Sequence, residues 1–179
     1  MLAVENTALV VIDVQEKLTR VMYQREKLVD NLQKLIRGIQ ILGIPIIATE
    51  QYSQGLGVTI PEIAKLISNI QPLSKLSFSC YSDEEFVRKL EVLGRKQVLV
   101  SGIESHVCVY QTVRDLINFG YEVHVVTDTV SSRTWENREI GLNMMNRMSA
   151  FLTSTEAVLF ELLKIANGER FKAISQIVK

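Results

Sequence analysis

Three side chains of this sequence could carry out chemistry because of their type and their place: Asp13, Lys75 and Cys108. Cys108 lies in "GIESHVCV" (102–109), where a predicted strand passes into a predicted helix. The free N–H groups and the dipole at a helix N-terminus favour a thiolate, and the same groups can bind the oxyanion of a tetrahedral intermediate. A buried structural cysteine is the alternative, and position alone does not decide between the two.

Asp13 and Lys75 are ambiguous when each is taken singly. Asp13 comes near the end of the apolar run "TALVVIDV" (7–14), so it is either a buried acid/base group or the cap of the following turn. Lys75 stands in "QPLSKLSFSC", which is typical of a short strand or crossover. On its own it indicates a lysine whose stem packs against apolar residues while its ammonium reaches water.

Other catalytic and binding patterns have little support. His106 and His124 are the only histidines. His124 falls in the middle of a predicted strand, and His106 is too near Cys108 in the sequence to be assumed a correctly aimed base. A cysteine–histidine pair and a Ser-His-Asp triad are therefore disfavoured. Neither G-x-x-x-x-G-K-S/T nor G-x-G-x-x-G occurs, so a nucleotide-binding protein is disfavoured as well.

Strand and helix patterns alternate along the chain. Strands are predicted at 7–14, 44–50, 96–102, 121–128 and 149–154, and helices at 28–42, 61–67, 82–94, 109–120, 132–147 and from 153 onward. Ser82 is the predicted cap of one helix, and Thr153 with Glu156 forms a predicted capping box for another. This order predicts an α/β fold, a three-layer α/β/α sandwich with a mainly parallel, Rossmann-like sheet. No linker or repeat divides residues 1–179, so one domain is expected.

Ligands of such sheets bind beyond the carboxyl ends of the strands, where loops and helix N-termini converge. The residues that follow the predicted strands are Asp13, Gln15, Glu50, Gln51, 102–108 and 128–133. The sequence therefore predicts that Asp13 and Cys108 lie at the same edge of the sheet.

Composition narrows the class of partner. Twenty basic and twenty acidic side chains cancel, so we expect no nucleic acid and no membrane as partners. The first residues lack a basic leader, and the apolar run there is broken by Asp13. Two cysteines cannot form a disulfide framework, which indicates a reducing, cytoplasmic location. Cys80 is expected to be an ordinary thiol that serves as the internal standard for Cys108.

The stretches "VVIDVQ", "KLSFS" and "VSGIESHVCV", in this order and at these spacings, resemble the isochorismatase-like cysteine hydrolases, the superfamily that includes nicotinamidases. The stretches "TEQYSQGLG", "SGIESHVCVYQT" and "SSR" resemble its subgroup of isochorismatase-domain-containing proteins, whose physiological substrate is generally unassigned. The resemblance covers essentially the whole chain and implies a hydrolase of this fold.

By that resemblance, Asp13, Lys75 and Cys108 are a catalytic triad. The resemblance also implies a cis peptide bond between Ile103 and Glu104, and an oxyanion hole formed by the backbone N–H groups of Glu104 and Cys108. We expect the Glu104 side chain to shape the turn locally and to have no catalytic role.

The sequence also departs from the nicotinamidase pattern. Nicotinamidases place an aspartate and histidines after the second strand to bind a metal, whereas this chain has "ATEQYSQG" there and no histidine before residue 106. We therefore expect neither a metal nor another cofactor, and a small amide or related carbonyl compound as the substrate. Residues expected to line the pocket are Gln15, Gln51, Tyr52, Phe78 and Tyr110.

Two further expectations concern how the chain acts. The alternative to a hydrolase is a catalytically silent member of the superfamily that acts as a binding or oligomeric scaffold. Members commonly form homo-oligomers, so we expect one here as well. The methionine-rich segment "LNMMNRM" either faces such a partner or packs internally.

Overall fold

The computed structural model describes residues 1–179 and contains one six-stranded sheet in the order β3-β2-β1-β4-β5-β6. The strands are β1 (Thr7–Ile12), β2 (Ile46–Gln51), β3 (Leu73–Lys75), β4 (Gln97–Ile103), β5 (Glu122–Ser131) and β6 (Phe151–Thr153). All neighbouring strands pair in parallel. The predicted sheet is confirmed, and it is parallel throughout.

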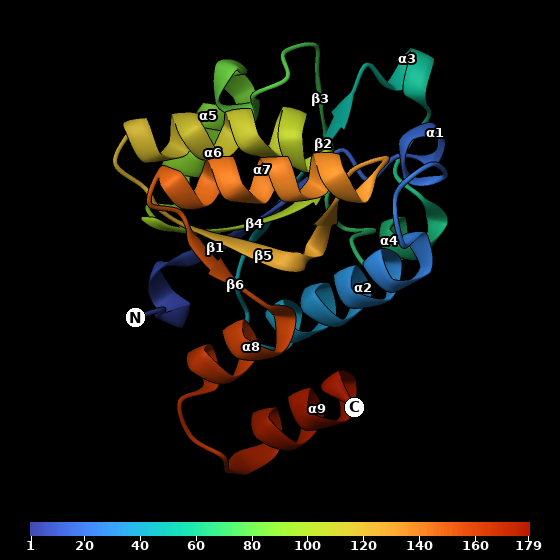
Figure 1. Cartoon of the computed structure of the whole chain (residues 1–179). Coiled ribbons are helices and arrows are strands. Elements are labelled where there is room, and N and C mark those ends of the chain that lie inside the picture. Colours follow the sequence, from blue (N-terminus) through green and yellow to red (C-terminus); the bar gives the residue numbers. More distant parts are fainter.

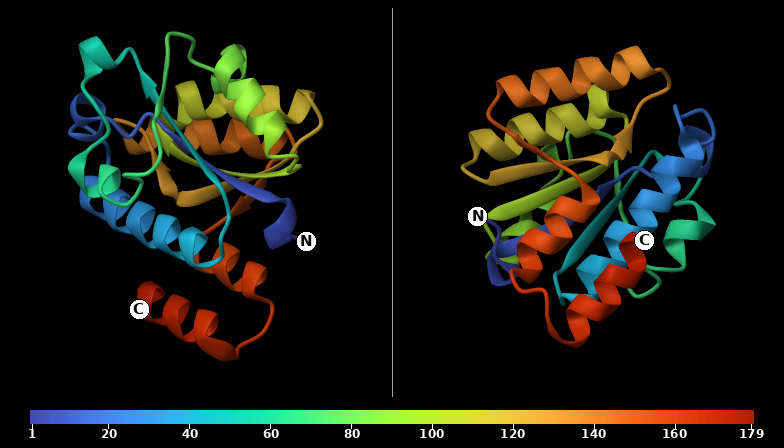
Figure 2. Two further views of the ribbon diagram at one scale, coloured as in Figure 1. Left: turned by 180° about the vertical axis from the view of Figure 1, so that it is seen from behind. Right: turned by 60° about the horizontal axis from the view of Figure 1, so that its bottom comes forward.

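Helices cover both faces of the sheet. They are α1 (Glu16–Thr19), α2 (Arg25–Ile41), α3 (Ser53–Leu56), α4 (Pro61–Ala64), α5 (Glu84–Val92), α6 (Tyr110–Asn118), α7 (Trp135–Arg147), α8 (Thr155–Leu163) and α9 (Gly168–Val178). Figure 1 shows α5, α6 and α7 above the sheet and α2, α8 and α9 below it. The tilted view in Figure 2 shows the same three layers, which confirms the predicted α/β/α sandwich. No helix is long and apolar enough to cross a membrane.

The central strand β1 is buried on both sides, as its unbroken apolar run predicts. All six of its residues are buried. Leu9 and Val11 pack with the α2 side of the core, whereas Val10 and Ile12 pack with the α5 and α6 side. This alternation follows from the two-residue period of a strand, so one short segment supplies both apolar layers. The position of the polar residue that follows, Asp13, is fixed by that packing.

Several predicted boundaries are wrong by one to three residues. β1 ends at Ile12 rather than at residue 14, because Asp13 adopts a left-handed backbone conformation with a φ of 53°. The helix predicted from residue 132 begins at Trp135, because the hydroxyl of Thr134 is the N-cap. The helix predicted from residue 153 onward is two helices, α8 and α9, and the short helices α1 and α3 were not predicted.

Two predicted helix caps are also wrong. Asp83, not Ser82, caps α5, since its carboxylate accepts two N–H bonds from the first turn. Ser154, not Thr153, caps α8. Thr153 is instead the last residue of β6, where its backbone pairs with Val126. In both helices the cap lies one residue closer to the helix than the sequence pattern indicated.

Candidate active site

The sheet brings three strand ends together around β1. Ile12, the last residue of β1, lies beside Thr49 of β2 and beside Gly102 of β4. On the outer side of β2, Gln51 lies beside Lys75 of β3. The chain builds β2 and β3 on one side of β1 and then β4 to β6 on the other, so this is the point where the strand order reverses. Open parallel sheets bind ligands at that point.

Asp13 and Lys75 form a buried ion pair there. The distance between Lys75 Nζ and Asp13 Oδ2 is 2.7 Å. Asp13 has no exposed surface and Lys75 only 2%. The Lys75 ammonium also donates to Gln51 Oε1 at 2.8 Å and to the backbone carbonyls of Ser77 and Phe78 at 3.1 and 3.2 Å. The prediction that Lys75 reaches solvent, which its own neighbours favoured, is therefore wrong.

Lys75 remains an ammonium in this setting. Burial by itself would lower its pKa, but the Asp13 carboxylate, through its charge and its hydrogen bond to Lys75, helps to raise the pKa above its ordinary value. The ammonium is thus a fixed, buried positive charge, and its donors are directed at protein acceptors.

Two thiols lie beside this pair. Cys108 follows β4 and has 6% of its surface exposed, whereas Cys80 lies in the loop after β3 and is wholly buried. Cys80 Sγ is 3.7 Å from Thr49 Oγ1, whose hydroxyl donates to Asp13 Oδ1 at 2.7 Å. Asp13, Lys75 and Cys80 are therefore also arranged like a triad. The sequence treated Cys80 as an ordinary reference thiol, whereas the structure places it in the same cluster.

Cys108 is a thiol at rest. Burial raises the pKa of Cys108, the negative charge of Asp13 raises it further, and the Lys75 ammonium only partly opposes them. The sequence predicted a thiolate favoured by the helix N-terminus, and the structure corrects this. A carboxylate buried next to the sulfur outweighs a helix dipole, because a full charge at short range in a poorly solvated site acts more strongly than a partial charge.

The turn at residues 103–109, called the 103–109 turn below, has an unusual backbone. Its Ile103–Glu104 peptide bond is cis, as the resemblance implied. Residues 105–109 form a single π-helical turn before α6 begins. A Cβ atom on Gly102 would lie 2.1 Å from the carbonyl oxygen of Ile12, and one on Gly141 of α7 would lie 2.6 Å from the carbonyl carbon of Ser105. Both glycines therefore allow close backbone approaches that hold the turn against β1 and α7.

The side chains of the 103–109 turn anchor it to the segment after β5. Glu104 Oε2 accepts bonds from Arg133 N at 3.2 Å and from Arg133 Nε at 3.1 Å. His106 Nδ1 lies 2.9 Å from Ser132 Oγ. Glu104 thus joins the turn to a segment remote in sequence rather than bonding locally, and His106 is engaged away from the Asp13–Lys75 pair.

Comparison with known proteins shows which family this chain belongs to. A family model described as the isochorismatase domain matches residues 7–157. This chain belongs to the isochorismatase family. A zebrafish relative, "Isochorismatase domain-containing protein 2", is 36% identical over 178 residues, covering 99% of this chain and 89% of the relative.

Solved structures share the fold of this chain. The structure titled "Structure of MAR1 Ribonuclease from Caenorhabditis elegans" has a TM-score of 0.93 and 34% identity, covering 99% of this chain and 91% of that one. The ycaC gene product of Escherichia coli, described as an octameric hydrolase of unknown specificity, has a TM-score of 0.93 at 21% identity, with 98% and 89% of the two chains covered. The E. coli protein therefore shares the fold of this isochorismatase-family chain.

The predicted pocket residues fall into two groups in this family member. Gln15 is wholly buried and its amide is used within the chain, since it donates to the carbonyls of Gln51 and Gly57 and accepts from Gln51 N. The Gln51 side chain holds Lys75 Nζ and donates to the carbonyl oxygen of Leu76. These two glutamines therefore hold the loops and the Lys75 ammonium in place through hydrogen bonds within the protein.

The aromatic members of the predicted pocket have free surface. Tyr52 and Phe78 are about half exposed on the loops after β2 and β3, and Tyr110 is half-buried at the start of α6. That any of them contacts a substrate remains a prediction. That the protein acts without a metal also remains a prediction. The structure has no group of three or more His, Cys, Asp or Glu side chains that could hold a metal ion.

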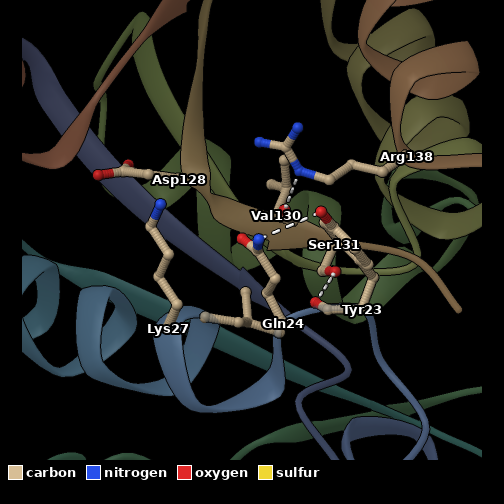
Figure 3. A pocket seen from close by; sticks show the side chains of 8 residues that line it. Tyr23, Gln24, Lys27, Asp128, Val130, Ser131 and Arg138 are labelled. Carbon is tan, nitrogen blue, oxygen red and sulfur yellow. Dashed lines mark hydrogen bonds between the residues drawn. The ribbon is translucent and has the colours of Figure 1, made fainter. Parts of the chain in front are cut away.

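A separate small hollow of about 70 Å³ lies at the end of β5, between the starts of α2 and α7 (Figure 3). It is lined by Tyr23, Gln24, Lys27, Leu28, Asp128, Val130, Ser131 and Arg138. The Arg138 guanidinium is already bonded to the carbonyls of Val130 and Thr127 and to Glu139. Asp128 Oδ1 accepts from Thr155 at the start of α8. The hollow contains none of the triad residues, and its polar groups are largely used to join β5 to the helices.

Sequence reasoning missed two members of the cluster, Thr49 and Cys80. Thr49 is a hydroxyl residue inside the apolar strand "IIATEQ", one residue before the predicted strand ends. A polar side chain at such a place must have a buried partner, and this was the available signal. Nothing in the sequence around Cys80 indicated that the loop after β3 folds back onto β2.

Proposed function

We propose that this chain is a cysteine hydrolase that cleaves a small, uncharged amide or related carbonyl compound without a metal. The observation that supports it is the buried Asp13–Lys75 ion pair, with a thiol on the 103–109 turn beside it. A buried ion pair with further hydrogen bonds is costly to form, so its retention next to a nucleophile is consistent with a chemical role.

Cys108 is the proposed nucleophile. It is the more accessible of the two thiols, and it lies at the strand–helix junction, whereas Cys80 is wholly buried. Thiol access decides this choice, because a nucleophile must reach the carbonyl carbon of a bound substrate. Cys80 has a supporting position behind Asp13.

The proposed reaction begins from the thiol. Asp13 takes the Cys108 proton as the sulfur attacks the substrate carbonyl, and the Lys75 ammonium stabilises the negative charge that this creates. Backbone N–H groups of Glu104 and Cys108 bind the tetrahedral oxyanion. Asp13 then gives its proton to the leaving amine, and a thioester forms. Asp13 next accepts a proton from water, which attacks the thioester, and the acid product leaves with the Cys108 thiol restored.

The substrate is proposed to be small and uncharged. The Lys75 ammonium donates to four acceptors that all belong to the protein, so Lys75 is not available to pair with a substrate anion. The half-exposed rings of Tyr52 and Phe78 are the proposed walls for a planar group.

Two alternatives make different predictions. A silent scaffold would have a Cys108 whose reactivity does not depend on Asp13 or Lys75. The name of the C. elegans neighbour suggests RNA as a substrate. Balanced charge does not favour it, because RNA binding rests on a surplus of basic groups. A short single-stranded RNA belongs in the substrate panel for that reason.

The decisive experiment measures iodoacetamide labelling of Cys108 against pH by mass spectrometry. Because Asp13 raises the pKa of Cys108 and Lys75 lowers it, Asp13→Asn should make labelling near neutral pH faster and Lys75→Met should make it slower. With p-nitrophenyl acetate as the probe substrate, Asp13→Asn should instead lose turnover, since the base is gone. Cys80→Ser should keep turnover and Cys108→Ser should not.

Labelling that ignores both substitutions, or turnover that survives Cys108→Ser, would contradict this mechanism. If turnover follows Cys80 instead, the nucleophile is the other thiol. Labelled wild-type protein should also lose its turnover in proportion to the Cys108 that has reacted.

We also propose a cytoplasmic homo-oligomer. The octameric E. coli neighbour supports oligomerisation. On α7, Trp135 and Ile140 are each 51% exposed, whereas Met145 of the methionine-rich segment is fully buried. The outer face of α7 is thus the proposed contact, and light scattering of wild type and Trp135→Glu tests it. A mass unchanged by the substitution would exclude that face.

A further inference from the structure

The Asp13 carboxylate is held by more than its ion pair. Asp13 lies beyond the end of β1 in a left-handed conformation, so the regular geometry of a strand does not set the direction of its side chain. Thr49 of β2 holds it at two points. Its carbonyl accepts from Asp13 N at 3.1 Å, and its hydroxyl donates to Asp13 Oδ1 at 2.7 Å. With Lys75 on Oδ2, both carboxylate oxygens are engaged, and the plane of the carboxylate is set.

The direction of the Thr49 hydroxyl is itself determined. A hydroxyl has one proton and an ionised carboxylate has none, so the proton of this bond comes from Thr49. Cys80 Sγ, 3.7 Å from Thr49 Oγ1, must then be the donor in its contact. Burial raises the pKa of Cys80 to about 11, so this thiol keeps the proton that it donates at neutral pH. A bond from Cys80 N to Thr112 Oγ1 at 2.9 Å fixes Cys80 against α6.

We propose that Thr49 is a positioning residue for the general base: its hydroxyl, oriented by Cys80, holds the Asp13 carboxylate with one oxygen on Lys75 and in place to serve Cys108. The inference rests on the proposed function and assigns Thr49 and Cys80 a part in it. Thr49 touches no reacting atom and acts through Asp13. Thr49 is 1% exposed and Cys80 is fully buried, so water cannot readily replace either group.

Loss of the hydroxyl has two consequences of different kinds. The carboxylate loses a fixed orientation, which slows proton transfer from Cys108. The ionised form of the base also loses a donor, so a higher pH is needed to keep it ionised. A residue with a merely structural role would lower the amount of folded protein without moving the pH dependence.

The test compares three variants. Thr49→Val removes the hydroxyl and keeps the shape, and Thr49→Ser restores the hydroxyl. Thr7→Val is the matched control, because Thr7 is a fully buried threonine at the opposite end of β1 whose hydroxyl donates to the Ala3 carbonyl. For each, iodoacetamide labelling of Cys108 and p-nitrophenyl acetate turnover are measured across pH, with the folded fraction determined by circular dichroism.

In Thr49→Val, the acid limb of the turnover profile should move up by about one pH unit, as expected for losing one hydrogen bond to a charged group. Turnover per folded molecule should fall about tenfold or more on the same argument. Thr49→Ser should restore both, and Thr7→Val should change neither. Cys80→Ala should move the acid limb in the same direction by less.

A Thr49→Val protein with an unshifted acid limb and native turnover would overturn the positioning role. That result differs from failure of the proposed function. If Asp13→Asn leaves Cys108 labelling unchanged, the hydrolase mechanism itself fails. If Asp13→Asn changes labelling as described above but Thr49→Val does not, only the inference about Thr49 fails.

Discussion

Breaking the buried ion pair from either side should destabilise the protein, and by unequal amounts. The charges of Asp13 and Lys75 are 2.7 Å apart and almost wholly buried. At an effective dielectric constant of about 20, two unit charges at this distance attract by about 6 kcal/mol. The cost of taking both ions out of water offsets much of that, so the pair adds little net stability while it is intact. Removing one partner leaves the other charge buried and costs about 3–5 kcal/mol.

The two single substitutions differ because the orphaned groups keep different partners. After Asp13→Asn, the Lys75 ammonium still has the Gln51 amide oxygen and the carbonyls of Ser77 and Phe78 as acceptors. We expect a cost near the lower end, about 3 kcal/mol. After Lys75→Met, the carboxylate loses the ammonium and keeps the hydroxyl of Thr49 as a side-chain donor. We expect a cost near the upper end, about 5 kcal/mol.

Urea unfolding of the wild type, the two single variants and Asp13→Asn/Lys75→Met measures these costs as a double-mutant cycle. The double variant leaves no buried charge, so it should cost at least about 2 kcal/mol less than the sum of the singles. If Lys75→Met is too unstable to fold, a folded double variant still demonstrates the coupling. Additive costs within about 0.5 kcal/mol, or an Asp13→Asn cost greater than that of Lys75→Met, would refute the reasoning.

Three further outcomes are expected. Gly141→Ala should lower p-nitrophenyl acetate turnover while the protein stays folded, because the added Cβ would lie 2.6 Å from the backbone of the 103–109 turn. Native turnover would show that α7 moves and leaves the turn in place. Glu104→Gln should lower the urea midpoint only slightly and leave Cys108 labelling unchanged, since the bond to Arg133 is partly exposed and only anchors the turn; a changed labelling rate would give Glu104 a part in the chemistry. The bond from His124 lowers the pKa of Glu122 below its ordinary value of 4.5, so its stabilising effect is present above that pH and is lost as the pH falls through the lower, folded-state value. Glu122→Gln should therefore flatten the dependence of the urea midpoint on pH in this acidic range, and an unchanged slope would contradict the assignment.

The fold could be predicted from the sequence because it depends on local pattern, and the main catalytic candidates could be predicted because their motifs resemble those of a known family. The unbroken apolar run of β1 predicts a strand buried on both faces, and the alternation of strands with helical stripes predicts a parallel sheet. The rule that strand ends converge then placed Asp13 and Cys108 at one edge. The motifs around Asp13, Lys75 and Cys108 supplied the family, and the match of residues 7–157 agrees.

Only the tertiary structure decided the electrostatics of the site, because charge effects depend on distances between segments that are remote in sequence. Lys75 looked solvent-bound among its own neighbours, yet β2 and the loop after β3 enclose its ammonium. Cys108 looked activated by its helix, yet its own burial and the buried Asp13 anion keep it a thiol. Cys80 looked like a reference thiol, yet it lies behind Thr49 next to the same pair. The period of the sequence pattern determines which face of an element is buried. Which side chains contact that face, and how strongly their charges interact in the poorly solvated interior, depends on the folded tertiary structure.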